Sequence, residues 1–321
     1  MELLKRIFSV HIHGTRILIY VLGIKIKLRN YRKELKKLKK RVNELDYANQ
    51  CRIAKILPVT SIKKIEIHIT DHCNLKCKGC HHFAPLVSQS FRDLEEFERD
   101  LTRLCALTKG KVDTFNILGG EPLLHPQCIE FLETARRIFP KSHIKLVTNG
   151  ILLPEQTDSF YERCAESNVL LQPTKYGVEV DWEAVEEKCR KFGVDFEFYA
   201  TNNLMWKDPI DLTGSQRAEY SFLNCQLGWH EVFYLDHGKL YHCSKTAYLK
   251  FFSDYFKKDI KVPETDCIDI YKVKDAQEIY DFMTRPPQFC AYCVKKKTLP
   301  YYPWGLSKKD ITEWVDTDTL A

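Results

Sequence analysis

The stretch from Thr70 to Pro85, "TDHCNLKCKGCHHFAP", carries three cysteines within eight residues. Cys73, Cys77 and Cys80 follow the alternating segment "KKIEIHIT", which predicts a β-strand that ends where the cysteines begin. Three thiols so close together, and odd in number, cannot form a useful set of disulfides. The pattern therefore indicates ligands for a metal ion or a metal cluster.

The composition is that of a globular protein with a substantial core. The chain has 321 residues, of which 44% are hydrophobic and 29% charged, and this length allows one large α/β domain with a smaller appendage. No stretch resembles a cleavable signal sequence. We therefore expect a cytoplasmic location, where the thirteen cysteines would bind metal rather than form disulfides.

The positive charge lies in an N-terminal arm, residues 1–60. Residues 1–50 carry a net charge of +9, and the remaining 271 residues carry a net charge of −3, which argues against a nucleic-acid enzyme. The apolar run "RILIYVLGIKIKL" is too short to span a bilayer. The next segment predicts a helix with one apolar stripe, formed by Leu35, Leu38, Val42 and Leu45. It fits a solvated arm, a short dimerising coil, or a helix resting on the inner face of the membrane.

Residues 61–210 alternate between strand-like and helix-like segments. Strands are expected near "KKIEIHIT", "VDTFNIL", "HIKLVTNG", "NVLLQPTKY" and "DFEFYA", with a sixth before Cys225 and helices in between. This order predicts parallel strands with right-handed crossovers in an α/β fold, for which a partial or full (β/α) barrel fits better than a sandwich. The loops "CNLKC", "GGE" and "TNG" follow three consecutive strands, so we expect them to meet at one mouth of the barrel.

Residues 211–321 predict a smaller unit that bears cysteines. "EVFYLDHGKLYHC" has the pattern of a β-hairpin that turns at Asp236, His237 and Gly238. A helix is expected over residues 274–285, followed by "PPQFCAYC".

Spacing alone leaves the ligand of the first cysteines open. Three thiolates suit a four-iron cluster that keeps one iron available to a small molecule. Zinc is the alternative, with His72, His81 or His82 as a fourth ligand, and three unrelated core thiols are another.

The motifs "CNLKCKGC", "GGEPLLHP" and "TNG", in this order over residues 62–200, resemble the radical S-adenosylmethionine (SAM) superfamily. The resemblance implies a partial (β/α)6 TIM barrel in which Cys73, Cys77 and Cys80 hold a [4Fe-4S] cluster whose free iron binds SAM. It also implies SAM contacts from the glycine-rich and "TNG" loops: Gly119, Gly120, Glu121, Thr148 and Asn149. Members of this family usually carry an aromatic residue before the third cysteine, to pack on adenine. Gly79 occupies that position here, so we expect Phe83 or a neighbouring histidine to replace it.

A second cysteine pattern lies downstream. Cys225, Gly238 and Cys243 are spaced as in the SPASM and Twitch extensions of radical SAM enzymes, and Cys290-x2-Cys293 follows. The resemblance, to the shorter Twitch form, implies a second [4Fe-4S] cluster held by Cys225, Cys243, Cys290 and Cys293. A structural four-cysteine zinc site is the alternative.

The resemblance implies a 5′-deoxyadenosyl radical that attacks a C–H bond, with flavodoxin or ferredoxin as electron donor. We expect an oxidoreductase, because a fully ligated second cluster can accept the electron left on the substrate. A sugar epimerase would need a thiol hydrogen donor, for which Cys267 is the candidate. The arm is similar to segments of surface-polysaccharide enzymes, which points to a sugar, nucleotide-sugar or glycan precursor. A peptide maturase, or a non-catalytic zinc or electron-transfer protein, would also account for the cysteines.

Overall fold

The computed structural model describes residues 60–201, 204–206, 209–225, 232–294 and 301–319, and the backbone of three N-terminal strands. The chain divides into two compact units, residues 1–54 and 55–321. The first boundary lies close to the predicted end of the arm.

The first unit contains an antiparallel sheet of β1 (Phe8–His13), β2 (Arg16–Val21) and β3 (Ile24–Arg29). Its register pairs Val10 with Ile19 and Ile19 with Ile26, so apolar residues of the three strands lie opposite one another. The apolar run of the arm is thus a pair of strands. The predicted helix with Leu35, Leu38, Val42 and Leu45 lies outside the described residues. In the described part of the chain, no helix is long and apolar enough to cross a membrane.

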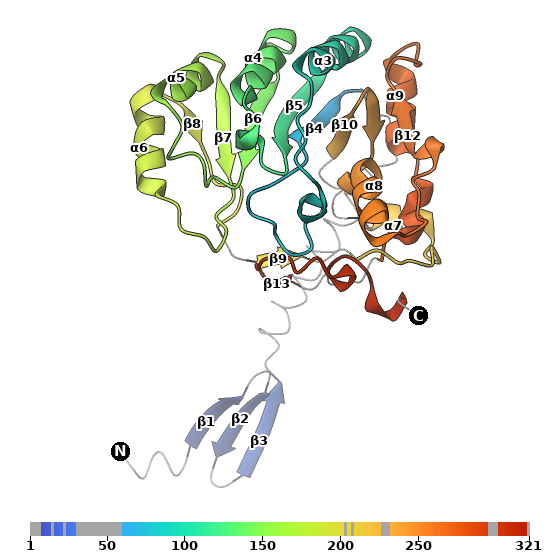
Figure 1. The fold of residues 1–321 in the computed structure, drawn as a ribbon. Helices are drawn as coiled ribbons and strands as arrows, with labels where there is room; N and C mark the ends of the chain where they lie inside the picture. Colours follow the sequence, from blue (N-terminus) through green and yellow to red (C-terminus); the bar gives the residue numbers. More distant parts are fainter. Residues whose placement is uncertain are drawn as a thin grey trace. The chain divides into compact units, whose positions relative to one another are not determined.

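The second unit is built on one sheet in the order β12-β11-β10-β4-β5-β6-β7-β8 (Figure 1). All neighbours from β10 to β8 are parallel, whereas β11 and β12 are antiparallel. The strands are β4 (Ile62–Thr70), β5 (Val112–Gly119), β6 (His143–Thr148), β7 (Val169–Pro173), β8 (Asp195–Phe196), β10 (Val232–Asp236), β11 (Lys239–Tyr241) and β12 (Cys267–Asp269). The predicted α/β class with a mostly parallel sheet, consistent with a partial TIM barrel, is confirmed.

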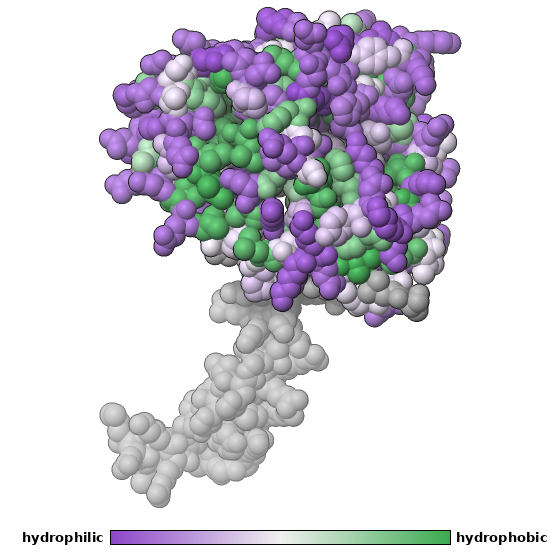
Figure 2. Space-filling view, viewed as in Figure 1, coloured by the Kyte–Doolittle hydropathy of each residue, from purple (hydrophilic) through white to green (hydrophobic). Residues whose placement is uncertain are grey.

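Four helices cover the outer side of this sheet (Figure 1): α3 (Leu94–Thr108), α4 (Cys128–Ile138), α5 (Asp158–Glu166) and α6 (Trp182–Phe192). Asp93, Thr157 and Asp181 cap three of them through side-chain bonds to backbone N–H groups. The alternation in β4 sends Ile65 and Ile67 into the core shared with these helices. The outermost surface over α3–α6 is mainly hydrophilic (Figure 2).

The sixth parallel strand is not where the sequence predicts it. The segment before Cys225 forms the helix α7 (Ala218–Leu223), whose Phe222 and Ser221 are buried. The sixth strand is β10, after Cys225, and it pairs with β4 rather than with β8. The short β9 (Leu204–Trp206) pairs instead with β13 (Tyr301–Pro303).

The predicted hairpin is present. β10 and β11 pair around His237 and Gly238, both of which have positive φ, as a two-residue turn of the I′ type requires. α8 (Ser244–Phe256), α9 (Ala276–Thr284) and the 3-10 turns η5 (Gln288–Tyr292) and η6 (Ile311–Glu313) complete the unit. Strands β10–β12, which lie beyond residue 210, extend the main sheet. The division into a barrel core at residues 61–210 and a cluster-binding unit at residues 211–321 therefore stays a prediction about function.

Candidate active site

Three loops meet at the carboxyl ends of β4, β5 and β6, as the sequence predicts. The amide of Gly120 donates to the carbonyl of Thr70 at 2.8 Å, and the amide of Glu121 donates to that of His72 at 3.0 Å. The side-chain amide of Asn149 reaches Asn74 Oδ1 at 2.7 Å and lies 3.7 Å from the Cys73 sulfur. Hydrogen bonds thus join the "CNLKC", "GGE" and "TNG" segments.

The two glycines permit this close approach. A Cβ on Gly119 would lie 2.0 Å from the carbonyl oxygen of Thr70, and a Cβ on Gly120 would lie 2.1 Å from that of His72. No larger residue fits at either position without displacing the backbone that leads to Cys73. The glycine pair therefore sets the distance between the first two loops.

Glu121 holds the second and third loops together from inside. Its carboxylate accepts from the Thr148 hydroxyl at 2.6 Å, from the Asn149 amide at 2.8 Å and from the Leu123 amide at 3.1 Å. The side chain is fully buried, and burial raises its pKa to about 7. With both oxygens engaged, this carboxylate orients the two loops.

The three cysteines of the first loop lie within electrostatic range of one another. Burial raises the pKa of Cys73 and of Cys77 to about 12, and the neighbouring Cys80 adds to both shifts. Two N–H groups point at the sulfurs: the amide of Leu75 lies 3.3 Å from Cys73 Sγ, and the indole of Trp304 lies 3.1 Å from Cys77 Sγ. Among the residues that the structure describes, no three His, Cys, Asp or Glu side chains are gathered closely enough to hold a single metal ion.

These surroundings fit a cationic iron–sulfur group. Mutually repelling, buried thiolates are stabilised when each binds a metal ion, and N–H donors to sulfur are what iron–sulfur sites use to adjust their potential. Cys73, Cys77 and Cys80 are thus suited to the ligand role predicted from their spacing, which stays a prediction.

The adenine-packing role expected of Phe83 stays a prediction. Its ring is fully buried and packs 5.8 Å from Phe252 and 6.4 Å from Trp314, centroid to centroid. The same ring also lines the small pocket described below. A second aromatic residue near all three thiols is Tyr176, in the loop after β7, whose phenol pKa rises through burial and the adjacent Cys77, Cys80 and Cys73.

The C-terminal segment is the part of the site that sequence reasoning missed. Residues 302–314 run along the first cysteine loop, where Leu306 pairs with Cys77 and the Trp314 indole donates to the carbonyl of Cys80 at 2.8 Å. The aromatic run "YYPWG" after the last cysteines was the only local signal, and nothing in it indicates which surface it covers.

The second cysteine pattern gathers around α7, α8 and η5. Cys243 is the N-cap residue of α8, and the Cys225 thiol is close enough to add to the rise in its pKa, which burial dominates. The amide of Cys293 donates to the carbonyl of Cys290 at 3.2 Å, and Ser221 on α7 donates to the carbonyl of Cys293 at 3.0 Å. The segments that bear the four predicted ligands are therefore neighbours.

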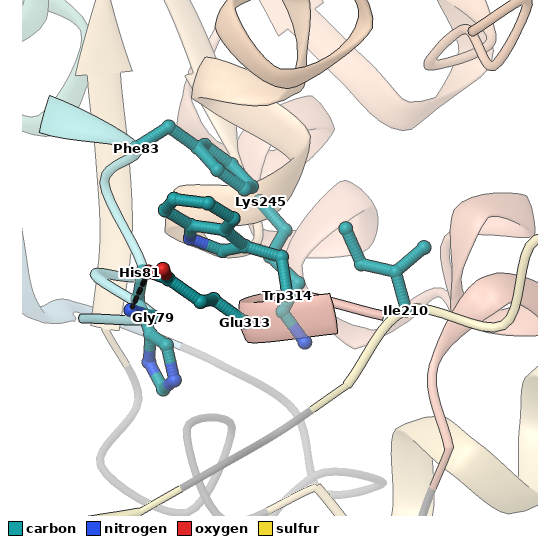
Figure 3. A pocket seen from close by; sticks show the side chains of 7 residues that line it. All are labelled: Gly79, His81, Phe83, Ile210, Lys245, Glu313 and Trp314. Atoms are coloured by element: carbon teal, nitrogen blue, oxygen red, sulfur yellow. Dashed lines mark hydrogen bonds between the residues drawn. The ribbon is translucent and has the colours of Figure 1, made fainter. Parts of the chain in front are cut away.

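A small pocket is lined by residues that adjoin both cysteine groups (Figure 3). Gly79, His81 and Phe83 reach it from the first cysteine loop and the turn after it, Ile210 from the segment before α7, Lys245 from α8, and Glu313 and Trp314 from the C-terminal segment. The buried Lys245 places its ammonium group 4.0 Å from the Cys293 sulfur. Lys245 thus lines the pocket and also contacts the second cysteine group.

Cys267 is not part of this arrangement. It opens β12, the edge strand of the sheet, three strands away from β4. Its register partner is Tyr241, and its thiol donates to the carbonyl of Glu264 at 3.5 Å.

The inner side of the sheet, opposite α3–α6, is polar. Asn116 on β5 donates to Glu66 on β4 at 2.8 Å, and His68 stacks on Tyr248 with ring centroids 3.8 Å apart. Burial lowers the pKa of His68 to about 4, although its contact with Asp71 opposes the shift. Within the described residues, His68 Nε2, Asn116 Oδ1 and the Tyr248 hydroxyl are buried without a hydrogen-bond partner, which is unusual enough to indicate a place for a polar ligand.

Comparisons with known proteins agree with the motifs. Residues 67–191 match the model of the Radical SAM superfamily. A probable GTP 3′,8-cyclase of Methanocella arvoryzae is 36% identical over 101 residues, which are 32% of this chain and 31% of that protein. The GTP 3′,8-cyclase of Alkaliphilus oremlandii is 32% identical over 120 residues, which are 36% of this chain and 37% of that protein. The chain thus spans about a third of the length of these curated relatives.

Among solved structures, BtrN in complex with AdoMet and 2-DOIA aligns with 79% of this chain and 98% of its own, at 12% identity and a TM-score of 0.44. Native anSMEcpe with bound AdoMet covers 42% of this chain and 43% of its own, at 22% identity and a TM-score of 0.34. The matched segment 67–191 contains the cysteine, "GGE" and "TNG" loops. These residues form a radical SAM superfamily domain.

Proposed function

We propose that this protein is a radical SAM oxidoreductase that oxidises a carbinol carbon of a sugar, nucleotide-sugar or glycan precursor to a carbonyl. The observation that carries the proposal is the pocket whose lining residues adjoin both cysteine groups. Gly79 and His81 lie beside Cys80, and Lys245 lies beside Cys243 and contacts Cys293. A substrate held near this pocket would lie close to both groups.

The first group supplies the radical. Cys73, Cys77 and Cys80 would hold the SAM-binding [4Fe-4S] cluster that the superfamily implies, which when reduced splits bound SAM into methionine and a 5′-deoxyadenosyl radical. The protein's own part is placement. Gly119 and Gly120 keep the loops close, and Glu121 orients Thr148 and Asn149 beside Cys73. Such positioning accounts for much of the rate in reactions of this kind.

A cluster held by the second group would accept the electron that oxidation leaves behind. Removing a hydrogen atom, a proton and one electron from a carbinol gives the carbonyl product, while SAM takes up the hydrogen atom and one electron to become methionine and 5′-deoxyadenosine. Cys225, Cys243, Cys290 and Cys293 would hold the accepting cluster. A protonated Lys245, whose Nζ lies 4.0 Å from the Cys293 sulfur, would favour a reduced, more negative cluster. A flavodoxin or ferredoxin would supply the first electron.

The polar inner face supports a hydroxyl-rich substrate. Glu66, Asn116, His68 and Tyr248 offer both donors and acceptors, and three of their polar atoms are buried without a partner among the residues that the structure describes. Tyr248 and His68 also provide ring faces. Hydroxyl groups of a sugar would satisfy such atoms, because each hydroxyl both donates and accepts.

Metal content and SAM cleavage test the proposal before any substrate is known. After anaerobic reconstitution, we expect roughly eight irons per chain, as two four-iron clusters require. Replacing Cys73, Cys77 and Cys80 by alanine should halve the iron and abolish formation of 5′-deoxyadenosine under dithionite. Cys105→Ala, on the outer helix α3, is the matched control and should keep both. Stoichiometric zinc without iron would refute the proposal in favour of a zinc protein.

Product analysis separates the remaining classes. The reduced holoenzyme should be incubated with nucleotide-sugars, with aminocyclitols and with GTP. GTP is included because two similar proteins are named GTP 3′,8-cyclases. An oxidised sugar with one 5′-deoxyadenosine per turnover supports the oxidoreductase. Conversion of GTP to a cyclised nucleotide would assign a cyclase instead. Solvent deuterium in an unoxidised sugar, lost in Cys267→Ala, would assign an epimerase, and modification of a precursor peptide would assign a maturase.

The arm and the location form a separate part of the proposal. We place the protein in the cytoplasm, with the basic residues 1–50 in contact with the inner face of the membrane. The full chain should co-sediment with anionic vesicles, less so as salt rises, and a chain starting at Ser61 should not. Equal sedimentation of both would refute membrane contact, and a salt-insensitive dimer of the full chain would favour the coil.

A further inference from the structure

We propose that the C-terminal segment Tyr302–Trp314 is a strap that completes the first cysteine site, with Trp304 as the hydrogen-bond donor to the Cys77 sulfur. The proposal concerns positioning residues for the superfamily chemistry and does not depend on the substrate. Several hydrogen bonds join this segment to the loop that bears Cys77 and Cys80.

Backbone pairing fixes the strap to the loop. The amide of Lys78 donates to the carbonyl of Gly305 at 2.8 Å, and the amide of Ser307 donates to that of Lys76 at 2.9 Å. These bonds flank an antiparallel bridge between Cys77 and Leu306. The strap therefore adds a short strand to the cysteine loop, so that the position of Cys77 depends on a segment more than 200 residues away.

Side chains of the strap hold the turn between Cys77 and Cys80. The Tyr302 hydroxyl donates to the carbonyl of Lys78 at 3.0 Å, and the Glu313 carboxylate accepts from the amide of Gly79 at 3.3 Å (Figure 3). The Trp314 indole donates to the carbonyl of Cys80 at 2.8 Å. Backbone polar groups of the turn are thus bound from outside, which fixes the direction in which the sulfurs point.

Glu313 in turn fixes the strap. Its carboxylate accepts from the hydroxyl of Ser307 at 2.7 Å and from the amide of Lys308 at 2.7 Å, and it closes a capping box with Asp310 at the start of η6. The side chain is buried. Because one carboxylate binds both the strap and the amide of Gly79, the strap and the cysteine turn are fixed together.

Trp304 has a more specific part. Its indole nitrogen lies 3.1 Å from Cys77 Sγ, and a tryptophan N–H can only donate. A donor to a ligand sulfur stabilises the more negative, reduced cluster and so raises its reduction potential. Trp304 is therefore a positioning residue that makes the first cluster easier to reduce.

Trp304→Phe tests this role, because it keeps a ring and removes only the N–H. In the reconstituted holoenzyme, the electron paramagnetic resonance signal that changes on addition of SAM identifies the first cluster. Its midpoint potential should become more negative in Trp304→Phe, with iron content unchanged. Trp314→Phe is the matched comparison, because it removes an indole bond to a carbonyl in the same strap and keeps the Trp304 bond to the sulfur. Its potential should shift less than that of Trp304→Phe. An unchanged potential in Trp304→Phe, or an equal shift in both variants, overturns the assignment.

A second measurement needs no cluster at all. In the reduced apoprotein, iodoacetamide labelling followed by mass spectrometry should modify Cys77 several-fold faster in Tyr302→Phe, which frees the turn without removing a bond to the sulfur, with Cys128 in the core as the internal reference. Equal labelling of Cys77 in wild type and Tyr302→Phe overturns the strap. If reconstitution yields no iron in any form, the cofactor assignment fails while this measurement still decides the strap.

Discussion

Gly120→Ala should damage the site through the backbone alone. The added Cβ would lie 2.1 Å from the carbonyl oxygen of His72, 2.3 Å from its carbonyl carbon and 2.6 Å from the carbonyl oxygen of Asp71. All three atoms belong to the backbone that leads to Cys73, so no side chain can rotate away. Relief requires a shift of about 1 Å between the two loops, since real Cβ contacts of this kind stay near or above 3 Å.

The expected cost follows from two terms. Overpacking of a tight contact costs about 1–3 kcal/mol, and the bond from the Glu121 amide to His72, 3.0 Å long, would be lost for roughly 1 kcal/mol more. Together they predict a loss of about 2–4 kcal/mol in the free energy of unfolding. For a unit of this size, each kcal/mol lowers Tm by roughly 2–4 °C. A displacement of about 1 Å near Cys73 should also lower SAM cleavage on the order of a hundredfold.

Urea unfolding of the reduced apoprotein measures the first quantity, and 5′-deoxyadenosine formation by the reconstituted enzyme measures the second. Gly193→Ala is the matched control, because this glycine has a φ of +71° at the end of α6 and an added Cβ would meet no atom within 4 Å. It should cost about 1 kcal/mol from the left-handed backbone and leave SAM cleavage intact. If Gly120→Ala unfolds at the same urea concentration as Gly193→Ala, the steric argument is wrong.

Two further predictions concern residues around the same mouth. Burial lowers the pKa of His68 to about 4 in the folded protein, against 6.5 for the free side chain. The contribution of neutral His68 to the free energy of unfolding is therefore fully present above pH 6.5 and is lost as the pH falls toward 4. The total loss is on the order of 3 kcal/mol. Urea titrations at pH 7 and pH 4.5 should therefore differ less in His68→Phe than in wild type, whereas the exposed His143→Asn should behave as wild type; an undiminished pH effect in His68→Phe contradicts the assignment. Gly79→Ala should be destabilising because φ is +63° and the new Cβ would lie 2.6 Å from the Tyr302 hydroxyl oxygen, and the cost should fall by about 1 kcal/mol in a Tyr302→Phe background, where that oxygen is absent; strictly additive effects would count against this contact.

The parts of the fold that the sequence predicts are those with local causes. The alternation of "KKIEIHIT" directs Ile65 and Ile67 toward the helices and Glu66 and His68 to the other face, and this period of two is visible without any partner strand. The convergence of the three loops follows from parallel strands, whose carboxyl ends share one edge of the sheet. The hairpin at His237 and Gly238 follows from the turn chemistry of these two residues.

The parts that the sequence did not predict depend on contacts without a local signature. The segment before Cys225 has strand-like residues, but burial of Phe222 and the packing of α7 on η5 make it a helix. β10 joins the sheet beside β4, the first strand of the barrel, and no feature of "EVFYLD" distinguishes this edge from the one at β8. The strap contacts a cysteine loop that lies more than 220 residues earlier in the sequence. No local pattern in the strap indicates this contact, so the sequence did not predict it.

Gly79 leaves the space into which the strap packs. An aromatic side chain before the third cysteine would need the space that the Tyr302 hydroxyl and the carbonyl of Glu313 occupy, and the left-handed backbone there disfavours any side chain. The aromatic groups near the thiols come instead from elsewhere. Trp304 contacts the Cys77 sulfur, and its ring lies 6.0 Å from that of Tyr176, which follows β7. A chain that supplies these rings from distant segments has no room for one at position 79, so the departure from the family pattern follows from the strap.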